Sequence, residues 1–175
     1  MKTEEVAVVP HVVNRIDIVT GISFDDFIER FEHVVPSVDM DALRMIEDRG
    51  GSWEDIVAAL AANAPHELMV YASIDVLGLL RVAGHATRAV EYFVGNHAIG
   101  EKVFREEPKW FLYAPLRMLV YSAPDGRAVF SMDQPSTVFD GLNNPTAARI
   151  GREMDLRTAR MLKALGIDAE SAFQQ

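Results

Sequence analysis

The sequence predicts one α+β domain in which an antiparallel-rich sheet packs on helices, and three observations predict this class. The chain of 175 residues has the usual length of one domain, and no long linker divides it. Apolar and polar residues alternate in several short segments, and the few helical segments between them are not placed as the regular crossovers of a parallel sheet. The turn Pro124-Asp125-Gly126 has the chemistry of a hairpin, which joins antiparallel strands.

The first part of the chain predicts a strand followed by three helices. Residues 12–19 are rich in β-branched side chains and alternate in polarity, as a half-buried strand does. Ser23 resembles the first residue of a capping box, and the helix that it begins carries apolar residues at helical spacing. Residues 39–49 and 52–62 predict two short helices joined by a diglycine turn, and we interpret residues 36–64 as a helical insert.

The rest of the chain predicts four more strands and two helices. Residues 76–84 form an apolar connection whose conformation the sequence does not predict, and we expect residues 170–175 to fray. The predicted strands cover residues 68–75, 87–94, 116–121 and 127–132, and the predicted helices cover residues 97–105 and about 145–165.

A sheet of this kind has a face that the helices do not cover. We expect all helices on one face, which leaves the other face to be polar, or to be covered by a partner or a ligand. The aromatic candidates for this second surface are Tyr71, Tyr92, Tyr121 and Trp110.

Composition and charge exclude several classes of protein. The chain has no cysteine, which excludes disulfides and thiolate metal sites, and no apolar run approaches the roughly 18–20 residues of a membrane span. Its first residues carry an acidic pair in place of the basic residues of a signal peptide, so we expect a cytoplasmic location. The net charge is −9, and the arginines near the C-terminus are diluted by Glu153 and Asp155, so we expect neither nucleic acid nor membrane as a partner.

Several short motifs are similar in order and spacing to one family. They are Gly95-Asn96 between a strand and a helix, Pro115-Leu116-Arg117 and Leu119-Val120-Tyr121 at the two ends of a strand, Gly126, Ser131 and Pro135. On these residues the chain resembles the domain-of-unknown-function family 302 (DUF302). Residues 15–31 and 68–75 resemble the first strand, first helix and second strand of that family, whereas residues 37–64 depart from it.

The resemblance implies a fold and an assembly, but no established activity. It implies a β-α-β(4)-α-like arrangement similar to the fold of the TATA-box-binding protein, commonly paired as a homodimer. Fold analogy carries no DNA binding to an acidic chain, because function belongs to sites.

The start of the helix predicted over residues 97–105 is the leading candidate site. Asn96 can cap this helix, and the free N–H groups of a helix start attract carboxylate or phosphate groups. His97 adds a titratable side chain at the same place. We therefore expect a homodimer that binds a small, partly apolar or anionic molecule. The candidate residues are Gly95, Asn96, His97, Glu101, Arg117, Tyr121 and Tyr113.

Three alternatives remain open from the sequence. His97 and Glu101 lie four residues apart on the predicted helix, which allows acid–base or metal-assisted enzyme chemistry, with His85 or Asp133 as a third ligand if a metal binds. A heme would use His85 or His97 as its axial ligand, but no attachment motif is present, and we assign no metal and no cofactor. The acidic helices of the insert could instead dock a protein partner.

Overall fold

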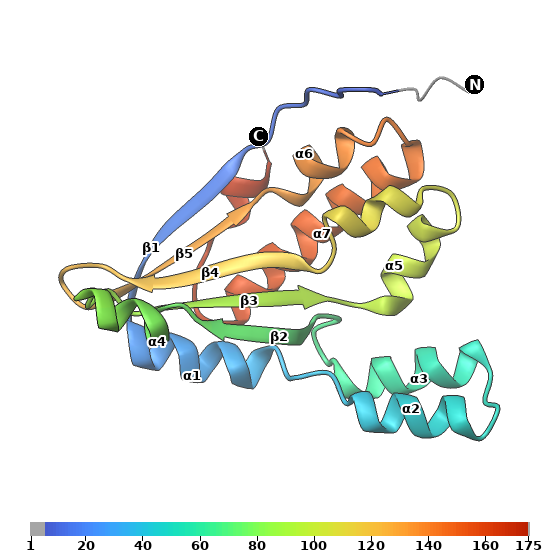
Figure 1. The fold of residues 1–175 in the computed structure, drawn as a ribbon, viewed down its shortest axis with the longest axis horizontal. Helices are drawn as coiled ribbons and strands as arrows, with labels where there is room; N and C mark the ends of the chain where they lie inside the picture. The colour runs from blue at the N-terminus through green and yellow to red at the C-terminus, as the bar shows by residue number, and fades with distance from the viewer. Residues whose placement is uncertain (1–5, 175) are drawn as a thin grey trace.

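The computed structural model describes residues 6–174, which form a five-stranded antiparallel sheet with the strand order β1-β5-β4-β3-β2 (Figure 1). Every neighbouring pair of strands is antiparallel. The prediction of an α+β fold with an antiparallel sheet is therefore confirmed. The strands are β1 (Arg15–Ser23), β2 (Met69–Asp75), β3 (Ala89–Gly95), β4 (Leu116–Ser122) and β5 (Arg127–Asp133).

Seven α-helices accompany the sheet in the described residues, and the sequence predicts five of them. These five are α1 (Phe24–Val34), α2 (Met40–Asp48), α3 (Trp53–Asn63), α5 (His97–Phe104) and α7 (Pro145–Ala164). The two short helices α4 (Leu77–Leu80) and α6 (Pro135–Asp140) are missed. The residue before each of these short helices makes no side-chain capping bond, and Pro135 at the first position of α6 is the local start signal there. Short 3₁₀ turns complete the chain at Arg81–Ala83, Pro108–Leu112 and Glu170–Phe173.

The start of α6 is capped by a residue that is distant in sequence. The carboxylate of Asp155, on α7, accepts the Ser136 backbone N–H at 3.0 Å and the Gln134 side-chain amide at 3.0 Å. Asp155 is buried, and burial raises its pKa, although both hydrogen bonds oppose this shift. This contact ties α6 to α7.

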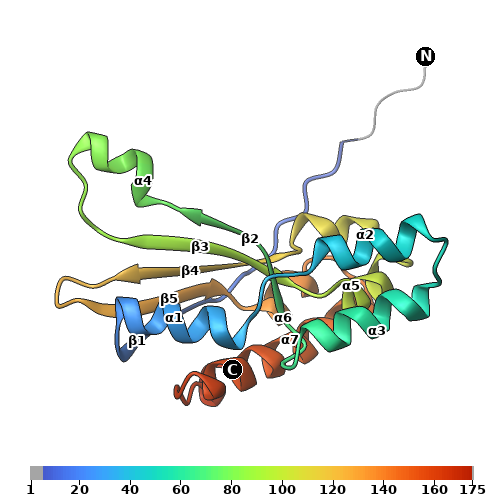
Figure 2. The same cartoon turned by 90° about the horizontal axis from the view of Figure 1, so that it is seen from below.

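Helices α1 and α7 cover one face of the sheet (Figure 2). Phe27 and Phe31 of α1 are fully buried, and their rings lie 6.3 Å from Phe130 and 4.6 Å from Tyr92, respectively. The Tyr92 hydroxyl donates to Glu32 at 2.9 Å. Tyr92 and Trp110 both belong to this core, so the expectation that they lie on the second surface is wrong.

The other face of the sheet, which we call the open face, carries the alternate residues of each strand. Leu116, Met118 and Val120 of β4 are buried in the core, so the intervening Arg117, Leu119 and Tyr121 point the opposite way. Both α1 and α7 lie on the far side of the sheet from these residues (Figure 2). Tyr121 therefore stands on the second surface, as expected.

The C-terminal segment is ordered up to residue 174. Residues 170–173 form a 3₁₀ turn, and Phe173 and Ala169 are buried in the main core. The expectation of a frayed tail is wrong for these residues, because burial of the Phe173 ring holds the segment against the domain. Gln175 lies outside the described residues.

None of the helices within residues 6–174 is long and apolar enough to pass through a membrane.

The packing of α1 gives a test of the fold. Replacing the buried Phe27 with alanine should lower the free energy of unfolding by about 3–5 kcal/mol, because it leaves a cavity between α1 and the sheet. Urea unfolding measures the change. The matched control Phe104→Ala removes a ring that is 48% exposed and should cost about 1 kcal/mol or less. Equal losses in the two variants would contradict this packing.

Candidate functional site

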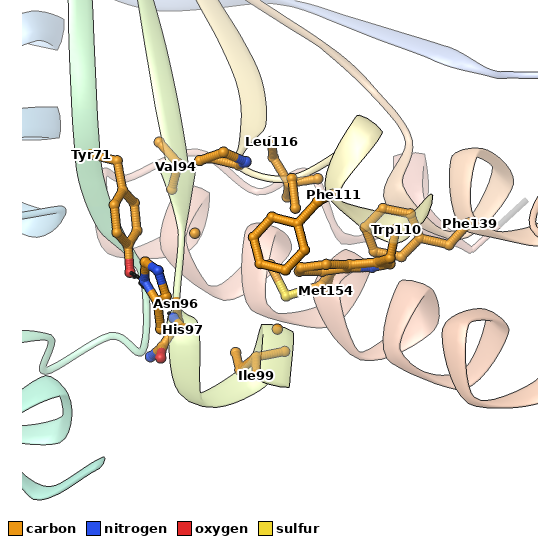
Figure 3. Close-up of a pocket in the computed structure, with 14 residues that line it drawn as sticks. Tyr71, Val94, Asn96, His97, Ile99, Trp110, Phe111, Leu116, Phe139 and Met154 are labelled. Carbon is orange, nitrogen blue, oxygen red and sulfur yellow. Dashed lines mark hydrogen bonds between the residues drawn. The ribbon is translucent and has the colours of Figure 1, made fainter. Parts of the chain in front are cut away.

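A narrow, mainly apolar pocket lies where β3 turns into α5 (Figure 3). The cavity has a volume of about 40 Å³, enough for a few water molecules. Tyr71 and His97 lie at one end of the pocket in Figure 3, and Trp110 and Phe139 lie at the other end. The apolar walls come from Val94, Ile99, Trp110, Phe111, Leu116, Phe139 and Met154.

The turn from β3 into α5 is set by Asn96 and by the close approach of Trp110. The Asn96 side-chain oxygen accepts the Ala98 N–H at 2.9 Å, and its amide donates to the Glu67 carbonyl at 2.9 Å. A Cβ on Gly100 would lie only 2.9 Å from the Trp110 ring, so glycine is required for this approach. The sequence identifies Asn96 as a cap but not the role of Gly100.

The first N–H groups of α5 already have partners inside the protein. His97 N–H donates to the Tyr71 hydroxyl at 3.2 Å, and Ala98 N–H donates to Asn96. Ile99 N–H and Gly100 N–H both donate to the Asn96 carbonyl, at 3.1 and 3.0 Å. The expectation of free backbone donors at this helix start is therefore wrong, and the side chain of His97 becomes the main polar group for a ligand.

Tyr71 is a site residue that the sequence prediction missed. It lies where the register of β2 against β3 shifts, between Val70 and Ala72. Its hydroxyl lies 2.6 Å from His97 Nδ1. A register shift carries no clear signal in the alternation of β2, so the sequence offered no means of placing Tyr71 beside His97.

The contact between Tyr71 and His97 occupies one of the two ring nitrogens of the imidazole. Burial lowers the pKa of His97, and burial also raises the pKa of Tyr71, so both groups are neutral near pH 7. The Tyr71 oxygen accepts the His97 backbone N–H, and the Tyr71 hydroxyl is also hydrogen-bonded to Nδ1, in a direction that depends on the tautomer of the ring. In the tautomer in which the hydroxyl donates to Nδ1, the neutral ring carries its proton on Nε2.

The other predicted site residues lie elsewhere. Glu101 does not line the pocket, and its carboxylate forms an ion pair with Arg105. Arg117 and Tyr121 belong to the open face, and Tyr113 lines a separate hollow together with Arg117. The structure therefore brings together Gly95, Asn96 and His97, but not Glu101, Arg117, Tyr113 or Tyr121.

Comparison with known proteins places this architecture in a family. The model of the family described as "Domain of unknown function DUF302" matches residues 44–165, which is more than half of the chain. The chain belongs to the DUF302 family. The match begins within α2 and runs to the end of α7, and β1 and α1 precede it.

A solved structure gives a second likeness to this DUF302 chain. The crystal structure of an uncharacterized conserved DUF302 protein from Bacillus stearothermophilus superposes with a TM-score of 0.59 at 19% identity. The likeness covers 87% of this chain and 97% of that chain, and it shows the fold alone. The comparison with curated proteins gives no match.

The metal alternative depends on where the acidic and histidine residues of the DUF302 chain lie. No group of three or more such residues within residues 6–174 is placed to hold a metal ion. His85 precedes β3 and His97 follows it, so the two histidines lie at opposite ends of that strand. His85 is therefore not placed to serve as a third metal ligand beside His97 and Glu101.

The helical pair α2–α3 lies against the polar end of the pocket in this DUF302 domain. Leu60 and Ala64 of the pair form a small core with Met69, and Tyr71 and Ala98 pack against it. Tyr71 thus contacts both the helical pair and His97.

The environment of His97 predicts its titration. Because burial favours the neutral ring, an NMR titration should give His97 a pKa below the ordinary value of 6.5. The unfolded chain binds this proton more readily, so the stability due to His97 is present above about pH 6.5 and is lost as the pH falls toward the folded pKa. The same protein in concentrated urea serves as the control. A folded-state pKa of His97 at or above its value in urea would contradict the assigned environment.

Proposed function

We propose that this DUF302 domain binds a small, largely apolar molecule that carries one hydrogen-bond-accepting oxygen, in the pocket beside His97. The observation that carries the proposal is the arrangement of the pocket, whose aromatic walls lie at one end and whose neutral Tyr71–His97 pair lies at the other. Ligand pockets commonly combine apolar walls with a few polar groups that fix orientation.

The size and polarity of the pocket limit the ligand. An open volume of about 40 Å³ suits a fragment-sized group, such as part of an aromatic ring or a short alkyl chain. With the Tyr71 hydroxyl donating to Nδ1, the Nε2–H group of His97 can donate to a carbonyl or a carboxylate oxygen. A carboxylate is also favoured by the dipole of α5, even though the first N–H groups of that helix are already paired.

A fragment screen tests the proposed ligand site. Trp110 lines the pocket, so small ketones, carboxylates and hydrocarbons can be followed by its fluorescence in a Trp53→Phe background. We expect acceptor-bearing fragments to bind best, and His97→Ala to weaken them about three- to tenfold, because a hydrogen bond contributes about 0.5–1.5 kcal/mol. The matched control Arg117→Ala lies outside the pocket and should leave binding unchanged.

Two results would contradict this function. If no fragment of the screen perturbs Trp110 or stabilises the protein to heat, the pocket is not a binding site. If Arg117→Ala weakens binding as much as His97→Ala does, the ligand lies on the open face.

We also propose that the domain is a homodimer in solution, with the open face as its interface. What supports this is a set of apolar side chains exposed on that face, where Val19 is 60% exposed, Ile74 is 48% exposed, and Leu119 and Tyr121 are partly exposed. The same face also carries charged residues, among them Asp17, Glu91 and Arg117. Sheets commonly bury such a face against a second sheet about 10 Å away. Sedimentation or light scattering at micromolar concentration should give twice the chain mass of 19.5 kDa. A clean monomer would refute the assembly.

A further inference from the structure

Two exposed phenylalanines stand beside the aromatic end of the pocket. Phe104, the last residue of α5, is 48% exposed, and Phe111, in the following 3₁₀ turn, is 46% exposed. Their ring centroids lie 5.2 Å apart at an angle of 87°, which is an edge-to-face contact. We call these two residues the aromatic shelf. Two exposed rings in contact form an apolar patch, unlike the scattered single residues that are ordinary on a protein surface.

The aromatic shelf is continuous with the pocket through Phe111. This residue lines the pocket beside Trp110 (Figure 3), and the two ring centroids lie 5.4 Å apart. Trp110 is only 6% exposed, so the three rings lead from a buried wall of the pocket to the surface. Phe104 does not line the pocket, and the exposed Leu112 lines a separate hollow. The apolar wall of the pocket therefore extends beyond the cavity, over the aromatic shelf.

Helix α5 gives this path its direction and its length. His97, Gly100 and Phe104 are separated by three and four residues, so they lie on one face of the helix. His97 and Gly100 line the pocket, and Phe104 comes one turn later. The rise from His97 to Phe104 is about 10 Å, which corresponds to about eight bonds of an extended chain at roughly 1.2 Å per bond.

The cavity alone is too small for most ligands. Its volume is about 40 Å³, whereas pockets that hold a drug-sized molecule have about 300–1,000 Å³. A molecule that binds firmly must therefore make contacts outside the cavity, and the aromatic shelf is the apolar surface that adjoins it. Because the cavity is narrow, the part of the molecule inside it must be slender. An unbranched hydrocarbon chain meets this condition, and a fused ring system does not.

We infer that the ligand is an unbranched chain of about eight carbons with a carboxylate or a carbonyl group at one end. The oxygen meets His97, the first carbons fill the cavity, and the remaining carbons lie across Phe111 and Phe104. The inference rests on the proposed function of the pocket and specifies the class of ligand.

The area and the charge of the aromatic shelf suit a small molecule better than a macromolecule. Two half-exposed phenylalanine side chains offer about 200 Å², whereas a stable protein interface needs about 800 Å² from each partner. The nearby charges balance, so no basic patch attracts an anionic membrane. These charged residues are Glu101, Glu106 and Glu107, together with Lys102, Arg105 and Lys109.

A series of straight-chain carboxylates tests the class of ligand. The fluorescence of Trp110 in the Trp53→Phe background follows the binding of butanoate, hexanoate and octanoate. A fully buried methylene raises the affinity about fourfold, and one that keeps one side in water raises it about twofold. The affinity should therefore rise from butanoate to octanoate, with a smaller gain per carbon once the chain leaves the cavity.

The variant Phe104→Ala isolates the aromatic shelf, because Phe104 lies outside the cavity. It should leave butanoate binding unchanged and weaken octanoate binding about three- to tenfold, whereas Phe104→Leu keeps an apolar side chain and should retain most of the octanoate affinity. His97→Ala should weaken both carboxylates by the same factor. The matched control Leu156→Ala truncates a side chain of α7 that is 55% exposed and should change neither affinity. Circular dichroism shows whether each variant is folded, and exposed positions tolerate such replacements.

The outcomes separate this inference from the proposed function. If octanoate binds no more tightly than butanoate, or if Phe104→Ala does not weaken octanoate selectively, the inference is wrong and the pocket remains a binding site. If neither carboxylate nor any other fragment binds, both proposals are wrong. If the protein sediments with phosphatidylglycerol vesicles, and does so less after Phe104→Ala, the aromatic shelf is a membrane contact and the inference is again overturned.

Discussion

The one-sided burial of the sheet is the constraint on which the rest of this structure depends. Phe27 and Phe31 of α1, together with the apolar side of α7, exclude water from one face of five antiparallel strands. Because adjacent residues of a strand point in opposite directions, this burial also decides what every remaining strand residue does. Arg117, Leu119 and Tyr121 face away from the core because Leu116, Met118 and Val120 face into it.

The same burial places the pocket at the end of the sheet and not on its face. Val94 and Leu116 belong to the core side of β3 and β4, and they reach the pocket where those strands end. There α5 leaves the sheet, and a histidine and a tyrosine meet beside aromatic side chains of the core. A polar pair at the margin of a hydrophobic core keeps its neutral form because the core disfavours charge, which the lowered pKa of His97 reflects.

Local signals in the sequence were sufficient for most of the fold. Ser23 and the spacing of the phenylalanines predicted α1, and the alternation of β4 with its hairpin turn predicted an antiparallel pair. Helix α6 was not predicted from the sequence, because the side chain that caps its start, Asp155, belongs to another helix. Of the predicted site residues, Gly95, Asn96 and His97 line the pocket beside α5, because they are neighbours in the sequence. Arg117 does not line it, and its position could be predicted only by knowing which face of β4 it occupies.

The contact between Gly100 and Trp110 has a consequence for how this cavity can vary. The indole ring rests against a helix position that has no side chain, and a single added methyl group would press on the ring at 2.9 Å. One carbon atom at that position therefore changes how closely the Trp110 ring can approach α5. A chain with alanine there would keep the same strands and helices but offer solvent a cavity of another shape, so the architecture and the selectivity of this pocket can diverge independently.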